Sequence, residues 1–351
     1  MSLLLSNFPP VRTDSKTYTD TFKSLLKDSD SVNLATGYIS TDSAIDLRNI
    51  IEANGGPRLN LCVGMHYFDG LTPVQNEALR SLDKTLRDNN LGQVYMVTTF
   101  PFHGKIVSFV NSENIIGSII GSSNLSNIIE GQRQYEADYL IENKADDTDL
   151  SAFIQDLISK GSSPLSELDV KVNIPENDLL VDQIGVKRVT KIEIDNARIN
   201  LSDTTFSLPL KADEAQRSGI NASFGEGRRN SQGFVMPRPW YEVELIVTKD
   251  ITCLPGYPQA DAKGDGGSFC VITDDGWTFQ CKVSGQNSKN LRSEDDLKVL
   301  GKWLKGRLEN AGLLTPGERV SDQTLADYGR ANITMTKQAD QDLWYMDFGV
   351  N

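Results

Sequence analysis

The residues around the second histidine of this chain have the types and spacing needed for phosphoryl chemistry. The sequence contains two histidines, His66 and His103, and Lys105 follows two positions after the second. Residues i and i+2 of a strand point to the same face, so a strand that opens at His103 places an imidazole beside an ammonium group. Imidazole can attack phosphorus or protonate a leaving oxygen, and lysine supplies fixed positive charge.

Further polar residues follow at the ends of the next expected strands. Gly121-Ser122-Ser123-Asn124 forms a turn after a strand, and Glu136 stands near the start of the following strand. Hydroxyl, carboxamide and turn N–H groups can hold phosphoryl oxygens, and a carboxylate can fix the tautomer of an attacking histidine. Alone, Ser122, Ser123 and Asn124 are ordinary turn residues. With His103 and Lys105 they predict metal-independent phosphodiester cleavage through a covalent phosphohistidine.

This combination resembles the HxK…GSxxN signature of the phospholipase D superfamily, over Phe102 to Glu136. One position departs from the signature: five residues after the lysine, where the superfamily has aspartate, stands Val110. The restriction-nuclease branch of the superfamily likewise lacks this aspartate, and the resemblance implies that Glu136 is the compensating carboxylate. The catalytic residues implied are His103, Lys105, Asn124 and Glu136, with Ser122 in support.

The mechanism needs two imidazoles, and the motif occurs once. Superfamily members with one motif pair two chains around one active site, so the resemblance implies a homodimer through the nuclease domain. His66 is an alternative second imidazole, but a lone histidine after a strand end is more often structural.

The first half of the chain alternates apolar runs with helical patterns, which predicts an α/β fold with a mixed sheet and flanking helices. We expect a nuclease and dimerisation domain over 1–165, a linker over 166–184 and a DNA-recognition domain over 185–351. Strands are expected at Val32–Ile39, Leu59–Gly64, Gln93–Thr99, His103–Val110, Asn114–Ser118 and Tyr135–Ile141, and helices at Asp42–Ala53, Pro73–Asn89 and Leu150–Ile158.

The second half is mainly β in pattern, with one amphipathic helix expected at Asp295–Glu309. Asp274-Asp275-Gly276 predicts a tight hairpin turn, with glycine at positive φ. Trp240, Trp277 and Trp303 are expected in the core. Strands are expected at Ile192–Ile199, Thr205–Leu210, Tyr241–Val247, Ser268–Thr273 and Trp277–Val283.

Two polar, basic stretches lie between these expected strands. Arginine can pair with guanine and asparagine or glutamine with adenine, so both stretches fit groove readout and phosphate contact. The alternative is that they are merely solvated loops. The candidate DNA-binding residues are Arg217, Arg228, Arg229, Asn230, Gln232 and Arg238 in the first stretch, and Lys282, Gln286, Asn287, Lys289, Asn290 and Arg292 in the second.

The order of motifs from Gly219 to Leu308 resembles the plant-B3-like DNA-binding domains of restriction endonucleases. Such domains are pseudobarrels that hold the major groove between an N-arm and a C-arm, which here correspond to the two basic stretches. The whole architecture is similar to the BfiI and NgoFVII type of restriction endonuclease. That likeness implies a type II, IIS-like enzyme that cuts double-stranded DNA without a cofactor, in the bacterial cytoplasm, with a cognate DNA methyltransferase as functional partner.

The net charge of −13 shows that DNA binding cannot depend on bulk charge. Local basic loops on an acidic body are required instead. The four cysteines lack metal-type spacing and are expected as buried thiols in a reducing compartment. The sequence predicts neither a signal peptide nor a membrane segment. Two other functions stay open: a DNA-binding regulator with a degenerate nuclease domain, and a phospholipase D-like enzyme acting on lipid.

Overall fold

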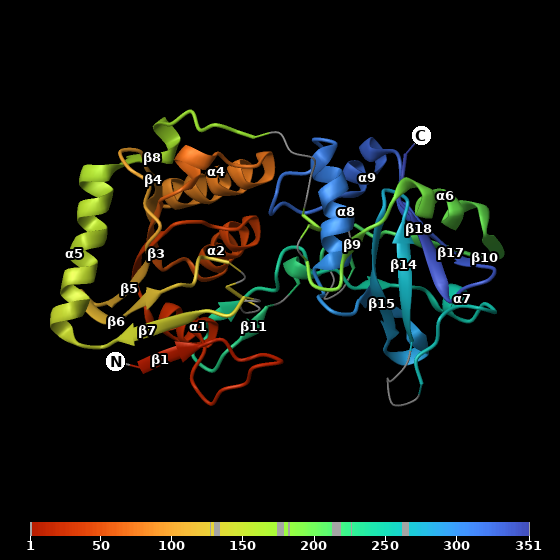
Figure 1. The fold of residues 1–351 in the computed structure, drawn as a ribbon, viewed down its shortest axis with the longest axis horizontal. Coiled ribbons are helices and arrows are strands. Elements are labelled where there is room, and N and C mark those ends of the chain that lie inside the picture. Colours follow the sequence, from red (N-terminus) through yellow and green to blue (C-terminus); the bar gives the residue numbers. More distant parts are fainter. Residues whose placement is uncertain are drawn as a thin grey trace. The chain divides into compact units, whose positions relative to one another are not determined.

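The computed structural model describes residues 2–126, 128–129, 134–173, 179–181, 183–212, 219–225, 227–261 and 267–350. Contacts divide the chain into two units (Figure 1). The first contains Met1–Pro175 together with Arg228–Pro237, and the second contains Glu176–Gly227 and Arg238–Asn351.

The first unit is built on a mixed eight-stranded sheet in the order β1-β7-β6-β5-β2-β3-β4-β8. Strands β2, β3 and β4 are parallel, and the remaining neighbours are antiparallel. The strands are β1 Ser2–Leu5, β2 Ser31–Thr36, β3 Arg58–Val63, β4 Gly92–Val97, β5 Lys105–Asn111, β6 Asn114–Gly121, β7 Ala137–Ile141 and β8 Ser162–Pro164. The helices are α1 Tyr18–Asp28, α2 Thr41–Asn54, α3 His66–Asp69, α4 Pro73–Asp88, α5 Lys144–Gly161 and the 3-10 turn η1 Leu165–Glu167.

Helices cover both faces of this sheet. Figure 1 shows α5 on the opposite side of the sheet from α2 and α4. On the α1 face, the ring of Phe22 meets Phe109 of β5 edge-on at 5.4 Å. On the α5 face, Ile154 packs in one buried cluster with Ala35 and Ile106. The sheet is therefore buried on both sides at its centre.

The antiparallel β5–β6 hairpin turns tightly at Ser112 and Glu113. Both residues have positive φ, +49° and +66°, as the two central residues of a type I′ turn require. Pairing begins directly beside the turn, between Asn111 and Asn114, and continues past a bulge to Ile106 and Ile120. The turn thus fixes the register of the strands that lead to the sheet edge described below.

The second unit is mainly β and forms a curled half-barrel sheet in the order β10-β17-β18-β14-β15-β16-β13, with β9 also paired to β15. The pair β14–β18 is parallel. The strands are β9 Lys187–Arg188, β10 Leu201–Pro209, β13 Leu245–Ile246, β14 Ser268–Thr273, β15 Trp277–Ser284, β16 Asn290–Ser293, β17 Asn332–Gln338 and β18 Leu343–Asp347. The helices are α6 Lys191–Ile199, α7 Lys249–Thr252, α8 Val299–Asn310, α9 Asp322–Tyr328 and the 3-10 turns η2 Ala222–Phe224 and η3 Gln286–Ser288.

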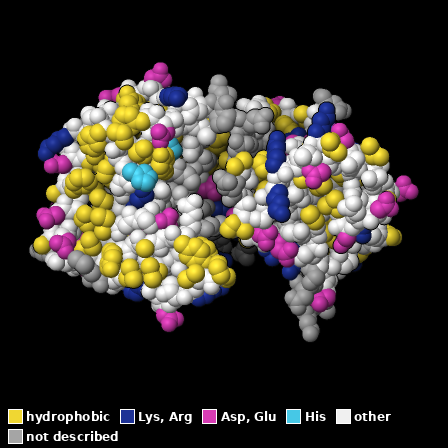
Figure 2. Space-filling view, viewed as in Figure 1, with side chains coloured by type: hydrophobic (Ala, Val, Ile, Leu, Met, Phe, Trp, Pro, Cys, Tyr) yellow, Lys and Arg dark blue, Asp and Glu magenta, His cyan; other side chains and the backbone are white. Residues whose placement is uncertain are grey.

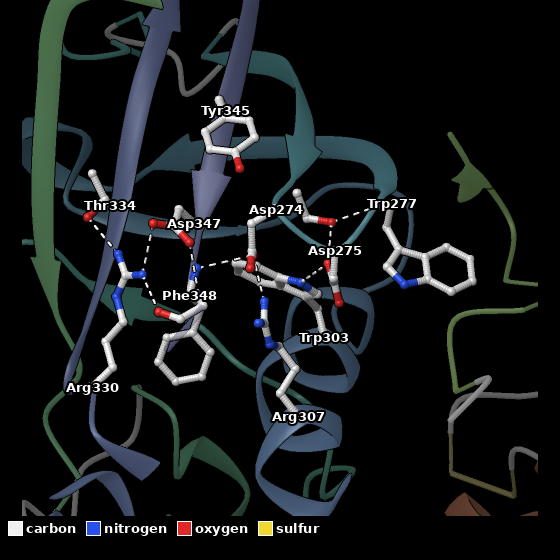
Figure 3. Close-up of polar contacts among 12 residues, drawn as sticks. Asp274, Asp275, Trp277, Trp303, Arg307, Arg330, Thr334, Tyr345, Asp347 and Phe348 are labelled. Carbon is white, nitrogen blue, oxygen red and sulfur yellow. Dashed lines mark hydrogen bonds and ion pairs between the residues drawn. The ribbon is translucent and has the colours of Figure 1, made fainter. Parts of the chain in front are cut away.

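A polar network ties the β14–β15 turn to α8 and to the end of β18 (Figure 3). Asp274 accepts from Arg307 at 2.5 Å and from the backbone N–H of Phe348 at 3.2 Å. Asp275 accepts the indole N–H of Trp303 at 2.9 Å. Gly276 has φ +92°, so the predicted turn is confirmed. Its aspartates close one end of the half-barrel rather than face solvent as ordinary turn residues.

The expected strand Ile192–Ile199 is wrong, because these residues form α6. The Thr190 hydroxyl accepts the N–H of Glu193 at 3.3 Å, and the Glu193 carboxylate accepts the N–H of Thr190 at 2.7 Å. This capping box starts a helix that the alternation of apolar residues concealed.

Other expectations were partly met. Of the predicted strand Tyr241–Val247, only Leu245–Ile246 pairs as a strand. The predicted helix at Asp295 begins four residues later, at Val299. The three tryptophans expected in the core are buried. The expectation of buried cysteines holds for Cys62 and Cys281, whereas Cys270 is half-buried and Cys253 is exposed, so the expectation is wrong for Cys253.

Candidate active site

The strand β5 begins at Lys105, so His103 lies just before the strand and not within it, contrary to the prediction. The two side chains nevertheless meet. The Lys105 Nζ atom lies 3.1 Å from Nδ1 and 3.2 Å from Nε2 of His103, and it donates to the His103 carbonyl at 2.6 Å. His103 is exposed, whereas Lys105 is 8% exposed. A buried ammonium group therefore lies beside an accessible imidazole.

Residues that follow β2 form a wall against His103. A Cβ atom on Gly37 would lie 2.9 Å from Cδ2 and 3.2 Å from Cα of His103, so glycine permits this close approach. The ring of Tyr38 meets that of His103 at 5.6 Å and 75°. The Tyr38 hydroxyl donates to Asp69 at 2.6 Å, which fixes the far end of the ring.

The loop after β6 is held by the start of β7. The Ser122 hydroxyl donates to the Glu136 carboxylate. Ser123 donates to Asp138 twice, through its backbone N–H at 3.0 Å and its hydroxyl at 2.6 Å. A Cβ on Gly121 would collide with Asp138. Glu136, just before β7, and Asp138 within it thus fix the loop that carries Asn124.

Asn124 connects this loop to the wall. Its Oδ1 accepts the backbone N–H of Tyr38 at 3.2 Å. The N–H of Leu125 donates to the Thr36 hydroxyl at 3.3 Å. The structure therefore gathers His103, Lys105 and Asn124 at one edge of the sheet, where β2 and β6 end and β5 and β7 begin.

Burial is the main influence on the charged groups of the site. Burial lowers the pKa of Lys105, and the negative charge of Glu136 partly offsets that effect. Burial raises the pKa of Asp138, and the hydrogen bonds that it accepts from Ser123 partly offset this effect. Among the described contacts, none joins the Glu136 carboxylate to His103, the residue it was predicted to orient. Val110 lies towards the other end of β5, opposite Ser31.

His66 lies close to this edge but is 5% exposed. Its Nδ1 is 3.2 Å from the carbonyl oxygen of Gly70, and its Nε2 is 3.3 Å from both the backbone N and O of Ile39. Burial lowers its pKa. The ring of Tyr38 packs on it at 5.3 Å. Both ring nitrogens are thus engaged by backbone, so His66 supports Tyr38 and offers no free imidazole.

Three residues of the site were not predicted from the sequence: Gly37, Tyr38 and Asp138. Gly37 and Tyr38 contact His103 from more than sixty positions earlier in the chain, and no local pattern signals this. Asp138 follows Glu136 by two positions, which in a strand places both carboxylates on one face. That spacing was the one available signal.

The first basic stretch forms a hairpin of β11 (Arg228–Arg229) and β12 (Val235–Met236), and its contacts group it with the first unit. Arg228, Arg229 and Gln232 are exposed. Asn230 accepts two backbone N–H groups of the turn, at 2.9 and 3.0 Å, so its side chain shapes the hairpin.

Two other residues of this stretch are placed differently. Arg238 forms an ion pair with Glu242 at 2.6 Å. Arg217 lies outside the described residues.

The second basic stretch is a hairpin between β15 and β16. Lys282 and Arg292 are directly opposed across it, and Lys282 lies 3.8 Å from the carboxylate of Glu294. Asn290 donates to Glu244 at 3.1 Å. Of the predicted DNA-binding residues at its tip, Gln286, Asn287 and Lys289 are exposed.

No cluster of metal-binding side chains occurs among the described residues. In the same part of the chain, no helix is both long and apolar enough to span a membrane.

Comparisons with known proteins define the class of both halves. Residues 16–169 match the family model of the NgoFVII restriction endonuclease N-terminal PLD domain. Residues 197–339 match the model of the NgoFVII C-terminal B3-like DNA-binding domain. The protein is therefore a phosphodiesterase of the DNA endonuclease class, with a phospholipase D-type nuclease domain and a B3-like DNA-binding domain. Both models describe one family and together match more than four fifths of the chain, which belongs to the NgoFVII family of restriction endonucleases.

These matches confirm both resemblances predicted from the motifs. Solved structures similar to the chain include NucT from Helicobacter pylori, at 17% identity and TM-score 0.33, covering 46% of this chain and 96% of that one. Nuc from Salmonella typhimurium matches at 11% identity and TM-score 0.31, covering 46% and 97%. A polyphosphate kinase from Porphyromonas gingivalis matches at 10% identity and TM-score 0.33, covering 49% and 26%. No curated protein sequence matches the chain.

Proposed function

We propose that this endonuclease cuts DNA without a metal ion, through a covalent phosphohistidine on His103. The observation that carries the proposal is the buried Lys105 ammonium group within 3.2 Å of both ring nitrogens of an exposed imidazole. One nitrogen attacks phosphorus, and the P–O bond to the leaving oxygen breaks. A second imidazole donates a proton to that oxygen. Water then attacks phosphorus, the P–N bond breaks, and the second imidazole takes the proton of the water.

The surrounding groups have distinct roles in this mechanism. Lys105 and Asn124 bind the phosphoryl oxygens, where developing negative charge gains most from fixed donors. Ser122 and Glu136 hold the loop that carries Asn124, and the charge of Glu136 favours the protonated form of Lys105. In this mechanism Glu136 also orients His103 once substrate is bound.

The second imidazole comes from His103 of a second copy of the chain. His66 cannot supply it, because His66 is buried and both its ring nitrogens contact backbone. Hydrophobic side chains gather around a histidine on the surface of the first unit (Figure 2). Phe100 and Phe153 are 48% and 47% exposed, and Phe102 next to His103 contacts Phe153 at 6.2 Å. An exposed apolar surface at the site favours a homodimer.

The target is double-stranded DNA, which the B3-like region, matched over residues 197–339, selects through the two basic hairpins that it spans. In the full scheme the enzyme is type II and IIS-like, acts in the bacterial cytoplasm and is paired functionally with a DNA methyltransferase. The exposed ends of both hairpins support direct contact with the duplex.

The test is cleavage of genomic DNA with and without EDTA. We expect cleavage to persist in EDTA, and His103→Ala to abolish it while specific DNA binding is retained. Acid quenching of a reaction on phosphorus-labelled DNA should destroy the acid-labile protein-bound label, whereas alkaline quenching should preserve it. Strict dependence on added Mg²⁺ would refute the mechanism. If the unaltered protein binds DNA but does not cut it, the result would favour the alternative function, a DNA-binding regulator with a degenerate nuclease domain.

A further inference from the structure

A cavity of about 240 Å³ lies in the first unit beside the catalytic groups. Its wall combines the segment after β1, the first turns of α1, the loop after β6 and the start of β7. Neither His103 nor Lys105 lines this cavity, and the mechanism described above does not use it.

The cavity shares its wall with the phosphate-binding loop. Ser123 and Asp138 line it, and Ser123 stands between Ser122 and Asn124. The same Ser123 and Asp138 border a smaller cavity against the Lys105 side chain. Ser6, also in the wall, accepts the backbone N–H of Glu136 at 2.8 Å. A group held here is therefore adjacent to the phosphoryl group that reacts.

The aromatic part of the lining is fixed in place. The ring of Phe8 stacks on Tyr135 at 4.3 Å and 27°, and the Tyr135 hydroxyl donates to the carbonyl of Phe8 at 2.8 Å. Tyr18 is buried and stacks on Phe22 at 5.7 Å. Two anchored rings provide a flat, apolar surface in the wall of the cavity.

The polar part of the lining offers both donors and acceptors. Thr19 is 6% exposed, and its hydroxyl has no hydrogen-bond partner among the described residues. Asp138, 2% exposed, and Asp20 supply carboxylate oxygens. Two carboxylates repel a phosphate but accept from an exocyclic amino group. Lys23 also lines the cavity, and its ammonium group donates to the backbone carbonyl of Ile129. With two carboxylates and one cation that is already engaged, the lining suits a neutral planar group with polar edges better than an anion.

The size of the cavity limits the ligand further. Pockets for drug-sized ligands measure roughly 300–1,000 Å³, so this cavity has room for one nucleobase and not for a base pair. A base of duplex DNA can enter only after leaving the stack, as in enzymes that rotate a base into a pocket.

We propose that this cavity binds one unpaired nucleobase of the cleaved strand, next to the scissile phosphodiester, and prefers bases with an exocyclic amino group. The proposal rests on the DNA cleavage proposed above. In this scheme the Thr19 hydroxyl and the carboxylates contact the base edge, while Phe8 and Tyr18 contact its face. Opening of one base beside the cut then accompanies phosphoryl transfer.

Matched variants on α1 test the proposal. Thr19→Val removes the cavity hydroxyl at constant shape. Thr21→Val is the control, because Thr21 is equally buried, has an unpartnered hydroxyl and lies outside the cavity lining. Once the cut is mapped, we expect Thr19→Val to slow single-turnover cleavage three- to tenfold, and Thr21→Val to cleave at the unaltered rate, with both melting temperatures preserved.

A binding measurement separates this proposal from the proposed function. 2-Aminopurine is placed within two nucleotides of the cut, and the His103→Ala protein is bound. We expect the fluorescence of 2-aminopurine to rise at one position when the His103→Ala protein binds. The rise should be smaller for the double variant that also carries Thr19→Val. Equal cleavage by the two threonine variants, or unchanged fluorescence at every position, overturns the base pocket and leaves the nuclease proposal intact. Absence of cleavage by the unaltered protein overturns the nuclease proposal instead.

Discussion

The contact between Gly37 and His103 gives a prediction whose size follows from the geometry. In Gly37→Ala the new Cβ would lie 2.9 Å from the imidazole Cδ2 and 3.2 Å from the backbone Cα. Ordinary contacts are 3.4–4 Å, so the ring must move by about 0.5–1.1 Å. Misplacement of a reacting group by about 1 Å can lower a rate about 100-fold. We expect single-turnover cleavage to fall about 10- to 100-fold, with DNA affinity unchanged.

The matched control is Gly117→Ala on β6. The one tight contact of its Cβ would be the end of the Leu140 side chain, at 3.3 Å, which can shift, while its other neighbours lie at an ordinary 3.6 Å. Cleavage and DNA affinity are measured for both variants, together with melting temperature. Full-rate cleavage by folded Gly37→Ala would refute the argument that this wall positions His103. Equal losses in both variants would show a general effect of packing instead.

Three further outcomes are expected. Tyr38→Leu should reduce the rate of single-turnover cleavage more than Tyr38→Phe, because the phenylalanine variant keeps the ring and loses only the hydrogen bond to Asp69. Equal cleavage rates of the two variants would exclude positioning of His103 by the ring. Lys305 is fully buried, which lowers its pKa to about 7 from 10.5. Between these values the unfolded chain binds a proton that the folded chain does not, so the free energy of unfolding should rise with pH by up to about 1.4 kcal/mol per unit. Urea unfolding at pH 7 and 8.5 tests this, and Lys305→Met should remove the slope. Arg228→Ala and Arg229→Ala should each weaken DNA binding and lower the slope of log affinity against log salt by about 1, whereas an unchanged slope would exclude phosphate contact.

Much of the fold could be predicted from the sequence because its signals are local. Strands alternating with helices in the first half predict the mixed sheet, and the shift to β pattern predicts a mainly β second half. The barrel-like form of that half followed only from the resemblance to B3-like domains. The error at Ile192–Ile199 arose because apolar spacing fits both periods over so few residues. The capping box from Thr190 to Glu193 was the stronger signal, since it satisfies the first N–H groups of a helix.

The candidate site was predictable only where its residues lie close in sequence or match a motif. His103 and Lys105 are in contact and Asn124 lies at the same sheet edge, although His103 precedes the strand because pairing with β2 begins at Lys105. Tyr38 depends on contacts with His66, Asp69 and His103 that only the folded sheet brings together. Such long-range contacts leave no pattern in a single sequence.

The tight turn at Ser112 and Glu113 has a consequence for how this enzyme can change in length. Surface turns usually tolerate insertions and deletions. This turn sets the pairing of β5 with β6, and a slip of one residue would move every side chain of a strand to the opposite face. At the end of the hairpin opposite the turn, the Lys105 side chain would then point away from the loop that carries Asn124. An inserted residue that shifts this pairing would therefore disturb the reacting groups from an exposed turn remote from them.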